Sequence, residues 1–318
     1  MTVARSHFVS PEAGGCYHCI QRCVRRAFLC GEDHYSGRSF EHRKAWIEDR
    51  LRHLSHCFAI AVHAYAVMSN HLHIVVQFDP SHARSWSDEE VATRWVRLFP
   101  PPDYDDALGE IRRQHLLANP ARLDVVRARL GDLSWFMRCL AEPIARRANR
   151  EDGCKGRFWE GRFKCQVLCD ERALLAAMAY VDLNPIRAGL AERLDDPVHT
   201  SGYERIVASR KLPEVLAEPL RPIMGMSISA SSLSSADYLQ LLDWTGRELA
   251  PGRRSKISER APAVLSQVDR SAFRWVMRVR GYGGGWGRVA GSAQDLVAWA
   301  ERLGQRWLRG IRLASLLT

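Results

Sequence analysis

The stretch YAVMSNHLHIVVQF, residues 65–78, contains a turn and a complete β-strand, and it decides the fold. Ser69-Asn70 supplies a turn between the apolar run at 58–68 and the segment 71–78, which predicts a β-hairpin. Alternate side chains of a strand share one face. One face is entirely apolar and is expected to be core; it consists of Leu72, Ile74, Val76 and Phe78. The opposite face carries His71, His73, Val75 and Gln77, so the two histidines point the same way, off the core side.

The segments around this hairpin alternate between strands and helices. The pattern predicts strands at 16–24 and 157–168, and helices at 41–56 and from Asp170 to about Leu183, before Pro185. Several helices joined by the breaker FPPPDYDD are expected within 86–150. Beyond residue 200, helices are expected at about 236–248, 262–280 and 293–309. This order predicts an α+β fold in which an antiparallel sheet has helices on one face.

Length and composition set broad limits on the class of protein. A chain of 318 residues suggests two domains. No apolar run is long enough for a membrane helix, and the N-terminus lacks the apolar core of a secretory signal, so we expect a cytoplasmic protein without membrane contact. The nine cysteines include one CxxC, at Cys16 and Cys19, and one CxxxC, at Cys165 and Cys169, which together are only a weak signal for a zinc site. We interpret them as reduced thiols that behave as small hydrophobic residues.

The charge is distributed unevenly along the chain. The formal net charge is +10, and residues 251–318 contain 13 Lys and Arg against 4 Asp and Glu. Such a basic segment indicates a polyanionic partner, and nucleic acid is favoured because the arginines alternate with aromatic residues. The aromatic residues are Trp275, Tyr282, Trp286, Trp299 and Trp307. A generally basic, solvated surface is the alternative, and some of the tryptophans have to be core.

The helix DERALLAAMAYVDLNPIRAGL, residues 170–190, has polar residues that complement the histidine pair. Two imidazoles on one strand face can bind one divalent cation, although His-x-His alone is more typical of surface or hydrogen-bonded residues. Tyr180 and Asn184 are four residues apart and hence share a helix face. Asn184 can offer a carbonyl oxygen to a metal, with the Tyr180 hydroxyl one turn away. By spacing alone, Tyr180 is more typical of a half-buried residue that anchors the helix.

Together these motifs resemble the single-tyrosine HUH transposases, which include the transposases of single-stranded insertion sequences and the REP-associated tyrosine transposases. The resemblance rests on His71-Leu72-His73 within VMSNHLHIVV and on the later AYVDLNPIRAGL. GRFWEGRFKCQVL, residues 156–168, also resembles the strand that precedes the tyrosine helix in that family. The resemblance covers roughly residues 10–200.

The resemblance implies a fold, an activity and a set of site residues. The fold would be an α/β sandwich built on an antiparallel sheet. His71 and His73 would bind Mg²⁺ or Mn²⁺, Asn184 would be the third ligand, and Tyr180 would be the nucleophile. The activity would be cleavage and rejoining of single-stranded DNA, including hairpins, through a 5′-phosphotyrosine intermediate, by a monomer or a homodimer.

The chain also departs from the compact members of that family. We expect a catalytic domain at 1–200 with a helical insertion at about 80–155, and a basic, mostly helical extension at 201–318 that binds DNA. Within the strand 157–168, Arg162, Lys164 and Gln166 share a face that either contacts a DNA backbone or is solvated. Arg187 either approaches a phosphate or pairs with a neighbouring acid.

Two other functions compete with DNA strand transfer. One is a non-catalytic or domesticated DNA-binding protein derived from such a transposase, although every catalytic residue type is present. The other is a metal-dependent hydrolase that uses His71 and His73 with water. Without an acidic ligand cluster near the histidines, the hydrolase is the least favoured.

Overall fold

A computed structural model describes most of the chain. The described residues are 7–9, 12–24, 29–32, 37–196, 198–228, 231–249 and 261–318. The first basic part of the C-terminal segment, residues 251–260, therefore lies outside the described residues.

The centre of the molecule is a six-stranded sheet with the strand order β5-β2-β3-β1-β4-β6. The strands are β1 (Gly15–Arg22), β2 (Ile60–Val67), β3 (His71–Phe78), β4 (Lys164–Leu168), β5 (Met224–Gly225) and β6 (Val289–Ala290). The predicted hairpin is the β2–β3 pair. All neighbouring pairs are antiparallel except β4 and β6, which are parallel. The predicted antiparallel sheet is thus a mixed one, because the long helical connection after β4 allows the chain to return in the same direction.

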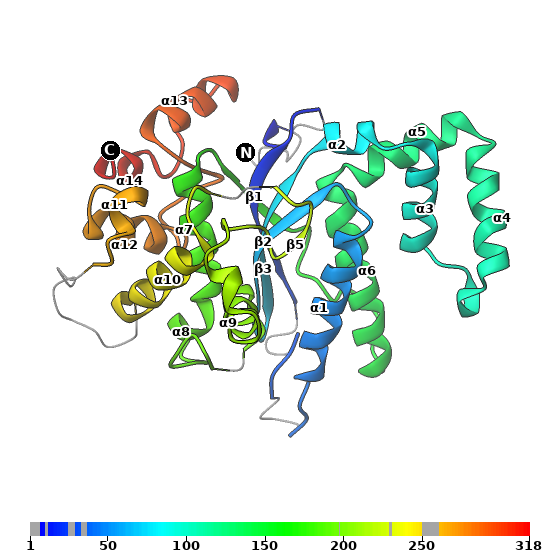
Figure 1. The fold of residues 1–318 in the computed structure, drawn as a ribbon, viewed down its shortest axis with the longest axis horizontal. Coiled ribbons are helices and arrows are strands. Elements are labelled where there is room, and N and C mark those ends of the chain that lie inside the picture. The colour runs from blue at the N-terminus through cyan, green and yellow to red at the C-terminus, as the bar shows by residue number, and fades with distance from the viewer. Residues whose placement is uncertain are drawn as a thin grey trace.

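Helices cover both faces of this sheet, and not one face as the element order predicted (Figure 1). One layer contains α1 (His42–Ser55) and α6 (Leu133–Glu151); the other contains α7 (Glu171–Asp182), α9 (Ser201–Lys211) and α10 (Ser235–Leu249). Every residue of β2 is buried as a result. The histidine face of β3 is therefore also interior: Val75 is fully buried and His73 is only 3% exposed. Alternation identified the two faces correctly, but it did not reveal that the polar one is covered.

The segment between β3 and β4 is helical, as the pattern at 86–150 predicted. It consists of α2 (Pro80–Ser85), α3 (Asp88–Leu98), the short 3₁₀ helix η2 (Pro102–Tyr104), α4 (Asp106–Leu117), α5 (Pro120–Leu130) and α6. Side chains of Ser87, Asp105, Asn119 and Asp132 cap the starts of α3, α4, α5 and α6. The α3–α5 group projects from one end of the molecule (Figure 1).

The remaining helices are short. They are α8 (Asn184–Arg187), the 3₁₀ helix η3 (Pro213–Leu216), α11 (Leu265–Val268), α12 (Ala272–Gly281), α13 (Ala293–Arg302) and α14 (Ile311–Leu316). The helix expected at 262–280 is divided because Ser271 caps a new helix through the Arg274 amide. The helix expected at 293–309 ends at Arg302, and Gly310, with φ +106°, precedes α14. Of the predicted strand 157–168, only the part from Lys164 onward forms a strand, which is β4.

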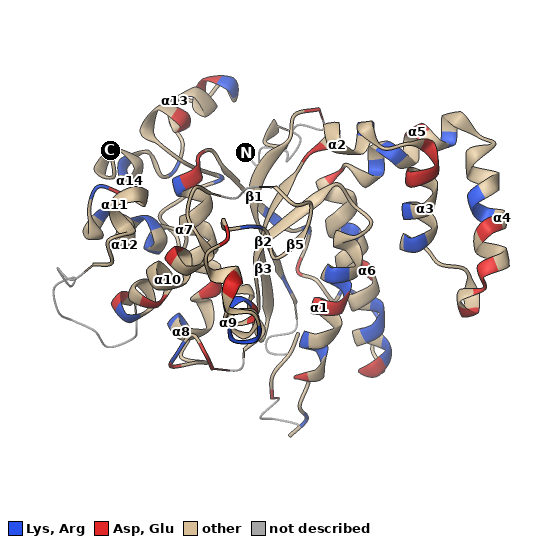
Figure 2. Cartoon of the chain, viewed as in Figure 1, with Lys and Arg blue, Asp and Glu red and all other residues tan. Residues whose placement is uncertain are grey.

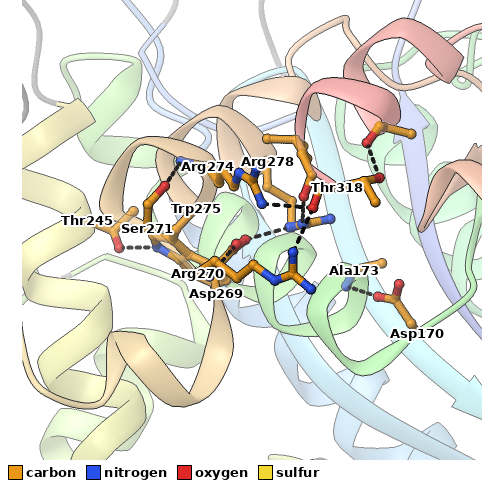
Figure 3. A network of polar contacts seen from close by, with 12 residues as sticks. Asp170, Ala173, Thr245, Asp269, Arg270, Ser271, Arg274, Trp275, Arg278 and Thr318 are labelled. Carbon is orange, nitrogen blue, oxygen red and sulfur yellow. Dashed lines mark hydrogen bonds and ion pairs between the residues drawn. The ribbon is translucent and has the colours of Figure 1, made fainter.

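The C-terminal extension at 201–318 is part of the same sheet, because it supplies both edge strands, β5 and β6. Its arginines make many internal contacts. Arg278 forms a buried ion pair with Asp269, and Arg270 and Arg274 both donate to the Thr318 carbonyl oxygen (Figure 3). Trp275 is fully buried and donates to the Thr245 hydroxyl. Several residues that suggested nucleic-acid contact therefore hold the fold together instead.

The positions of the charged residues and of the cysteines can be compared with the expectations from composition. Lys and Arg are spread over helices on both sides of the sheet and are not confined to the C-terminal segment (Figure 2). All nine cysteines are free; five of them are buried, three are partly buried and Cys154 is exposed. Among the described residues, no helix combines the length and apolarity required to cross a membrane.

Candidate active site

Three neighbouring strands place polar side chains on the face of the sheet beneath α7. In β1 and β3, Arg22 lies opposite His71 and Ile20 opposite His73. In β1 and β4, Ile20 lies opposite Lys164 and His18 opposite Gln166. Since residues two apart on a strand share a face, His18, His71, His73, Lys164 and Gln166 all lie on this side of the sheet.

Helix α7 lies across these strands and delivers Tyr180 to the same face. Asp170 starts the helix by accepting from the Ala173 amide at 2.6 Å. Four alanines allow the helix to pack closely on the sheet, and all of them are buried: Ala173, Ala176, Ala177 and Ala179. Every residue from Ala173 to Asp182 is buried, so the helix position is fixed by packing on all sides.

Aromatic contacts fix the Tyr180 ring beside the histidines. Its ring centroid lies 5.7 Å from that of His73 and 5.9 Å from that of His18, in edge-to-face geometry. The Arg187 guanidinium lies over the Tyr180 ring, 4.4 Å from its centroid. Tyr282, from the C-terminal segment, packs against both Tyr180 and His18 at 5.7 Å. Such contacts stabilise one orientation of the phenol ring.

A pocket of about 550 Å³ opens over this face, and its lining includes His71, His73 and Tyr180. The two sequence motifs, more than one hundred residues apart, thus meet in one cavity. Arg22, Arg162 and Lys164 bring three exposed cations to the same pocket, and Glu160 brings an acid. The pocket therefore combines two imidazoles, a phenol and a predominantly basic wall.

The other predicted site residues take different positions. Gln166 lies behind the pocket, where its Oε1 atom is 2.7 Å from His18 Nδ1. Arg187 reaches the phenol ring and, within the described part of the chain, pairs with no acid. Asn184 is buried at the start of α8 and is not among the described residues that line the pocket. The helix breaks at Leu183, so the four-residue spacing between Tyr180 and Asn184 does not describe one continuous helix. The role of Asn184 as a ligand stays a prediction.

Sequence reasoning missed His18, Arg22 and Glu160, and it named Tyr282 only as one of the aromatic residues of the basic segment 251–318. His18 is fully buried, and its Nε2 atom is 2.9 Å from His73 Nδ1. Its signal in the sequence was only its place in a predicted strand, because the pairing of that strand with the His-x-His strand was unknown. Tyr282 comes from the glycine-rich segment at 281–287, for which the sequence offered no link to the site.

Burial keeps the three histidines of this face neutral. It lowers the pKa of His18 to about 4, and the same cause, with nearby Arg22, lowers the pKa of His71 to about 4. Burial also lowers the pKa of His73 well below its usual value, assisted by His18, His71 and Arg187. A neutral imidazole has one nitrogen with a free lone pair, which is the form that binds metals.

The donor set fits a divalent cation held by few protein atoms. The His71 and His73 ring centroids are 4.7 Å apart, and both rings border the pocket. Asn70 Oδ1 lies 2.6 Å from His71 Nδ1; since a carbonyl oxygen only accepts, Nδ1 donates and Nε2 keeps its lone pair. Among the described residues, no group of three or more His, Cys, Asp or Glu side chains is arranged to hold a metal. The arrangement thus suits an ion whose remaining positions are filled by water or substrate oxygens, not a closed zinc site.

The chain was compared with family models, curated proteins and solved structures. No family model and no curated protein matches the chain. One similar solved structure is described as a "REP associates tyrosine transposase bound to a REP hairpin". The similarity covers 74% of this chain and 96% of that chain, with 12% sequence identity and a TM-score of 0.35.

Proposed function

We propose that the protein is a metal-dependent DNA strand transferase that cleaves and rejoins single-stranded hairpin DNA through Tyr180. The observation that carries the proposal is the meeting of Tyr180 with His71 and His73 in one pocket. The same residues carried the resemblance to single-tyrosine HUH transposases. Their convergence from β3 and α7 supports the view that the two motifs form one site.

In the proposed step, the Tyr180 hydroxyl oxygen attacks a backbone phosphorus atom. The new bond joins phosphorus to the tyrosine oxygen, and the bond to the 3′ oxygen breaks, which releases a 3′-hydroxyl and leaves a 5′-phosphotyrosine. The phenol loses its proton to solvent, and the departing 3′ oxygen gains one. The phosphodiester energy is retained in the covalent intermediate, so a 3′-hydroxyl can later attack it and rejoin a strand.

The chain's own residues prepare this reaction in two ways. His71 and His73 present neutral imidazoles to Mg²⁺ or Mn²⁺, which, when bound, would offset the negative charge that develops on the phosphate. Arg162 and Lys164 line the pocket and would contact phosphate groups of the strand, and Arg187 orients the phenol ring. Two neutral ligands leave the cation its full charge.

A non-catalytic DNA-binding protein is the alternative, and adduct formation distinguishes the two. Full-length protein is incubated with end-labelled single-stranded hairpins and Mn²⁺, and covalent protein–DNA species are resolved under denaturing conditions. The proposal predicts an adduct whose DNA-linked tryptic peptide contains Tyr180. Salt-dependent binding without an adduct would favour the alternative, and cleavage without an adduct would indicate a hydrolase.

A further inference from the structure

A chain of hydrogen bonds connects the pocket to the C-terminal segment through the interior of the sheet. Gln166 Nε2 donates to the Gly287 carbonyl oxygen at 2.7 Å, and Gln166 Oε1 lies 2.7 Å from His18 Nδ1. His18 Nε2 in turn lies 2.9 Å from His73 Nδ1. Three segments, β1, β3 and β4, contribute one side chain each, and the last acceptor is a main-chain atom just before β6.

The chemistry of each member determines the direction of every hydrogen bond. The Gly287 carbonyl only accepts, so the Gln166 amide nitrogen faces it and the amide oxygen faces His18. An amide oxygen only accepts, so His18 Nδ1 carries a proton and donates. His18 is fully buried, and its two ring nitrogens face an amide oxygen and a second imidazole, an environment that favours the uncharged ring. Its Nε2 therefore accepts and His73 Nδ1 donates. In neutral His73 the lone pair is therefore on Nε2.

We infer that His18 and Gln166 are positioning residues which fix His73 in the tautomer whose Nε2 lone pair is free for a divalent cation. This inference rests on the proposed function for its biological purpose. Asn70 makes the corresponding bond to His71, so both histidines of the pair have Nδ1 occupied as a donor. Neutral histidine has two tautomers, and a fixed acceptor at Nδ1 selects one of them before any ion arrives.

The C-terminal segment is required for this arrangement, since it supplies the terminal acceptor. Gly287 leaves no space for a side chain: a Cβ atom there would lie 2.7 Å from the Arg309 carbonyl oxygen. The Tyr282 ring packs against the His18 ring in edge-to-face geometry, beside these hydrogen bonds. The Tyr282 hydroxyl donates to the Ala173 carbonyl oxygen at 2.8 Å, which ties this segment to the helix of Tyr180.

Histidine tautomers can be measured directly in the metal-free, full-length protein. Long-range ¹H–¹⁵N spectra of ¹⁵N-histidine-labelled protein distinguish protonated from unprotonated ring nitrogens, and a His73→Gln variant assigns the signals. We expect His73 to be protonated at Nδ1 in the wild-type protein and to become a tautomer mixture in His18→Phe and Gln166→Leu. A wild-type His73 protonated at Nε2, or one unchanged in both variants, overturns the inference.

Metal binding provides the second measurement. By electron paramagnetic resonance of free Mn²⁺, we expect the dissociation constant to rise about 10-fold or more in His18→Phe and Gln166→Leu. The matched control is His63→Phe: His63 is also fully buried in the sheet and bonded to a glutamine, with Nε2 3.2 Å from Gln77 Oε1, but it does not line the pocket. The Mn²⁺ affinity of His63→Phe should equal that of the wild type. An equal reduction of affinity in all three variants contradicts a specific role for the hydrogen bonds that His18 and Gln166 make.

The two proposals fail in different ways. If His73 has the expected tautomer but no Tyr180 adduct ever forms, the strand-transfer proposal fails and the positioning role stands. If the adduct forms while both variants keep the wild-type tautomer and Mn²⁺ affinity, the positioning role fails alone. A thermal unfolding scan of each variant confirms that it is folded; should His18→Phe not fold, the wild-type spectrum and Gln166→Leu still decide the question.

Discussion

The phenol ring of Tyr180 stands edge-on to the imidazole of His73, with ring centroids 5.7 Å apart and an angle of 80° between the planes. The two residues come from a helix and a strand that are more than one hundred residues apart in the chain. Because both line one pocket, a substrate group bound there would contact a potential nucleophile and a potential metal ligand at once. The proposed site depends on this contact more than on any single residue.

Removal of either pocket histidine should weaken metal binding. Each of His71→Ala and His73→Ala leaves one imidazole, so we expect the Mn²⁺ dissociation constant to rise at least 10-fold, measured by electron paramagnetic resonance. His82, in α2 outside the pocket, provides the control His82→Ala. Unchanged Mn²⁺ affinity in both pocket variants would mean that the ion binds elsewhere.

The basic wall of the pocket should contribute to DNA affinity and its salt dependence. In Arg162→Ala with Lys164→Ala, we expect weaker binding of a single-stranded hairpin and a salt slope shallower by about 0.7 for each phosphate that is no longer neutralised. Fluorescence anisotropy at several salt concentrations measures both quantities. Arg112→Ala with Arg113→Ala in α4, at the far end of the insertion, is the control with the same charge change. Equal slopes for the two double variants would place the DNA elsewhere.

His63 should make stability depend on pH. Burial lowers its pKa to about 4, below the value of about 6.5 expected for the unfolded chain. Between these values the unfolded state binds more protons, so the free energy of unfolding falls as the pH falls from 6.5 towards 4. Between pH 7 and 4.5 the wild type should lose about 2 kcal/mol more than His63→Phe, as measured by urea denaturation. Parallel decreases in both proteins would show that His63 does not take part.

A buried carboxylate should hold α7 in position. Asp182 accepts from the Ser201 hydroxyl, from the Gly202 amide at 2.8 Å and from the Tyr238 hydroxyl at 2.6 Å, which joins α7 to α9 and α10. Tyr238→Phe removes one donor from a fully buried acid, so we expect a decrease of about 1–3 kcal/mol in the free energy of unfolding. Tyr203→Phe, in α9, is the control. Equal stability of the two variants would contradict the role of this network.

The sequence predicted individual residues of the candidate site better than it predicted which distant strands pair with one another. His71, His73 and Tyr180 became candidates because strand alternation and the motif resemblance depend only on local order, and all three line one pocket. His18 was missed because its role depends on which strand lies beside it, and strand pairing is a long-range property. The same limit applies to β6, whose two residues join the sheet far from its other strands in sequence.

Asn184 illustrates a different limit of the sequence argument. The spacing from Tyr180 suggested one helical face, but Pro185 cannot continue the helix of Tyr180, and the chain starts a new short helix at Asn184. The arginines and tryptophans of the C-terminal segment show a third limit. Composition could not separate buried pairs such as Arg278 and Asp269 from cations available to DNA.

The most direct test of the central claim is covalent adduct formation by Tyr180→Phe. This change removes only the hydroxyl oxygen and keeps the ring that packs against His73, His18 and Arg187. With single-stranded hairpin DNA and Mn²⁺, we predict that the wild type and Tyr203→Phe form a denaturation-resistant adduct, whereas Tyr180→Phe binds the hairpin but forms none. An adduct of wild-type yield in Tyr180→Phe would contradict the account, because the nucleophile would then be a different residue.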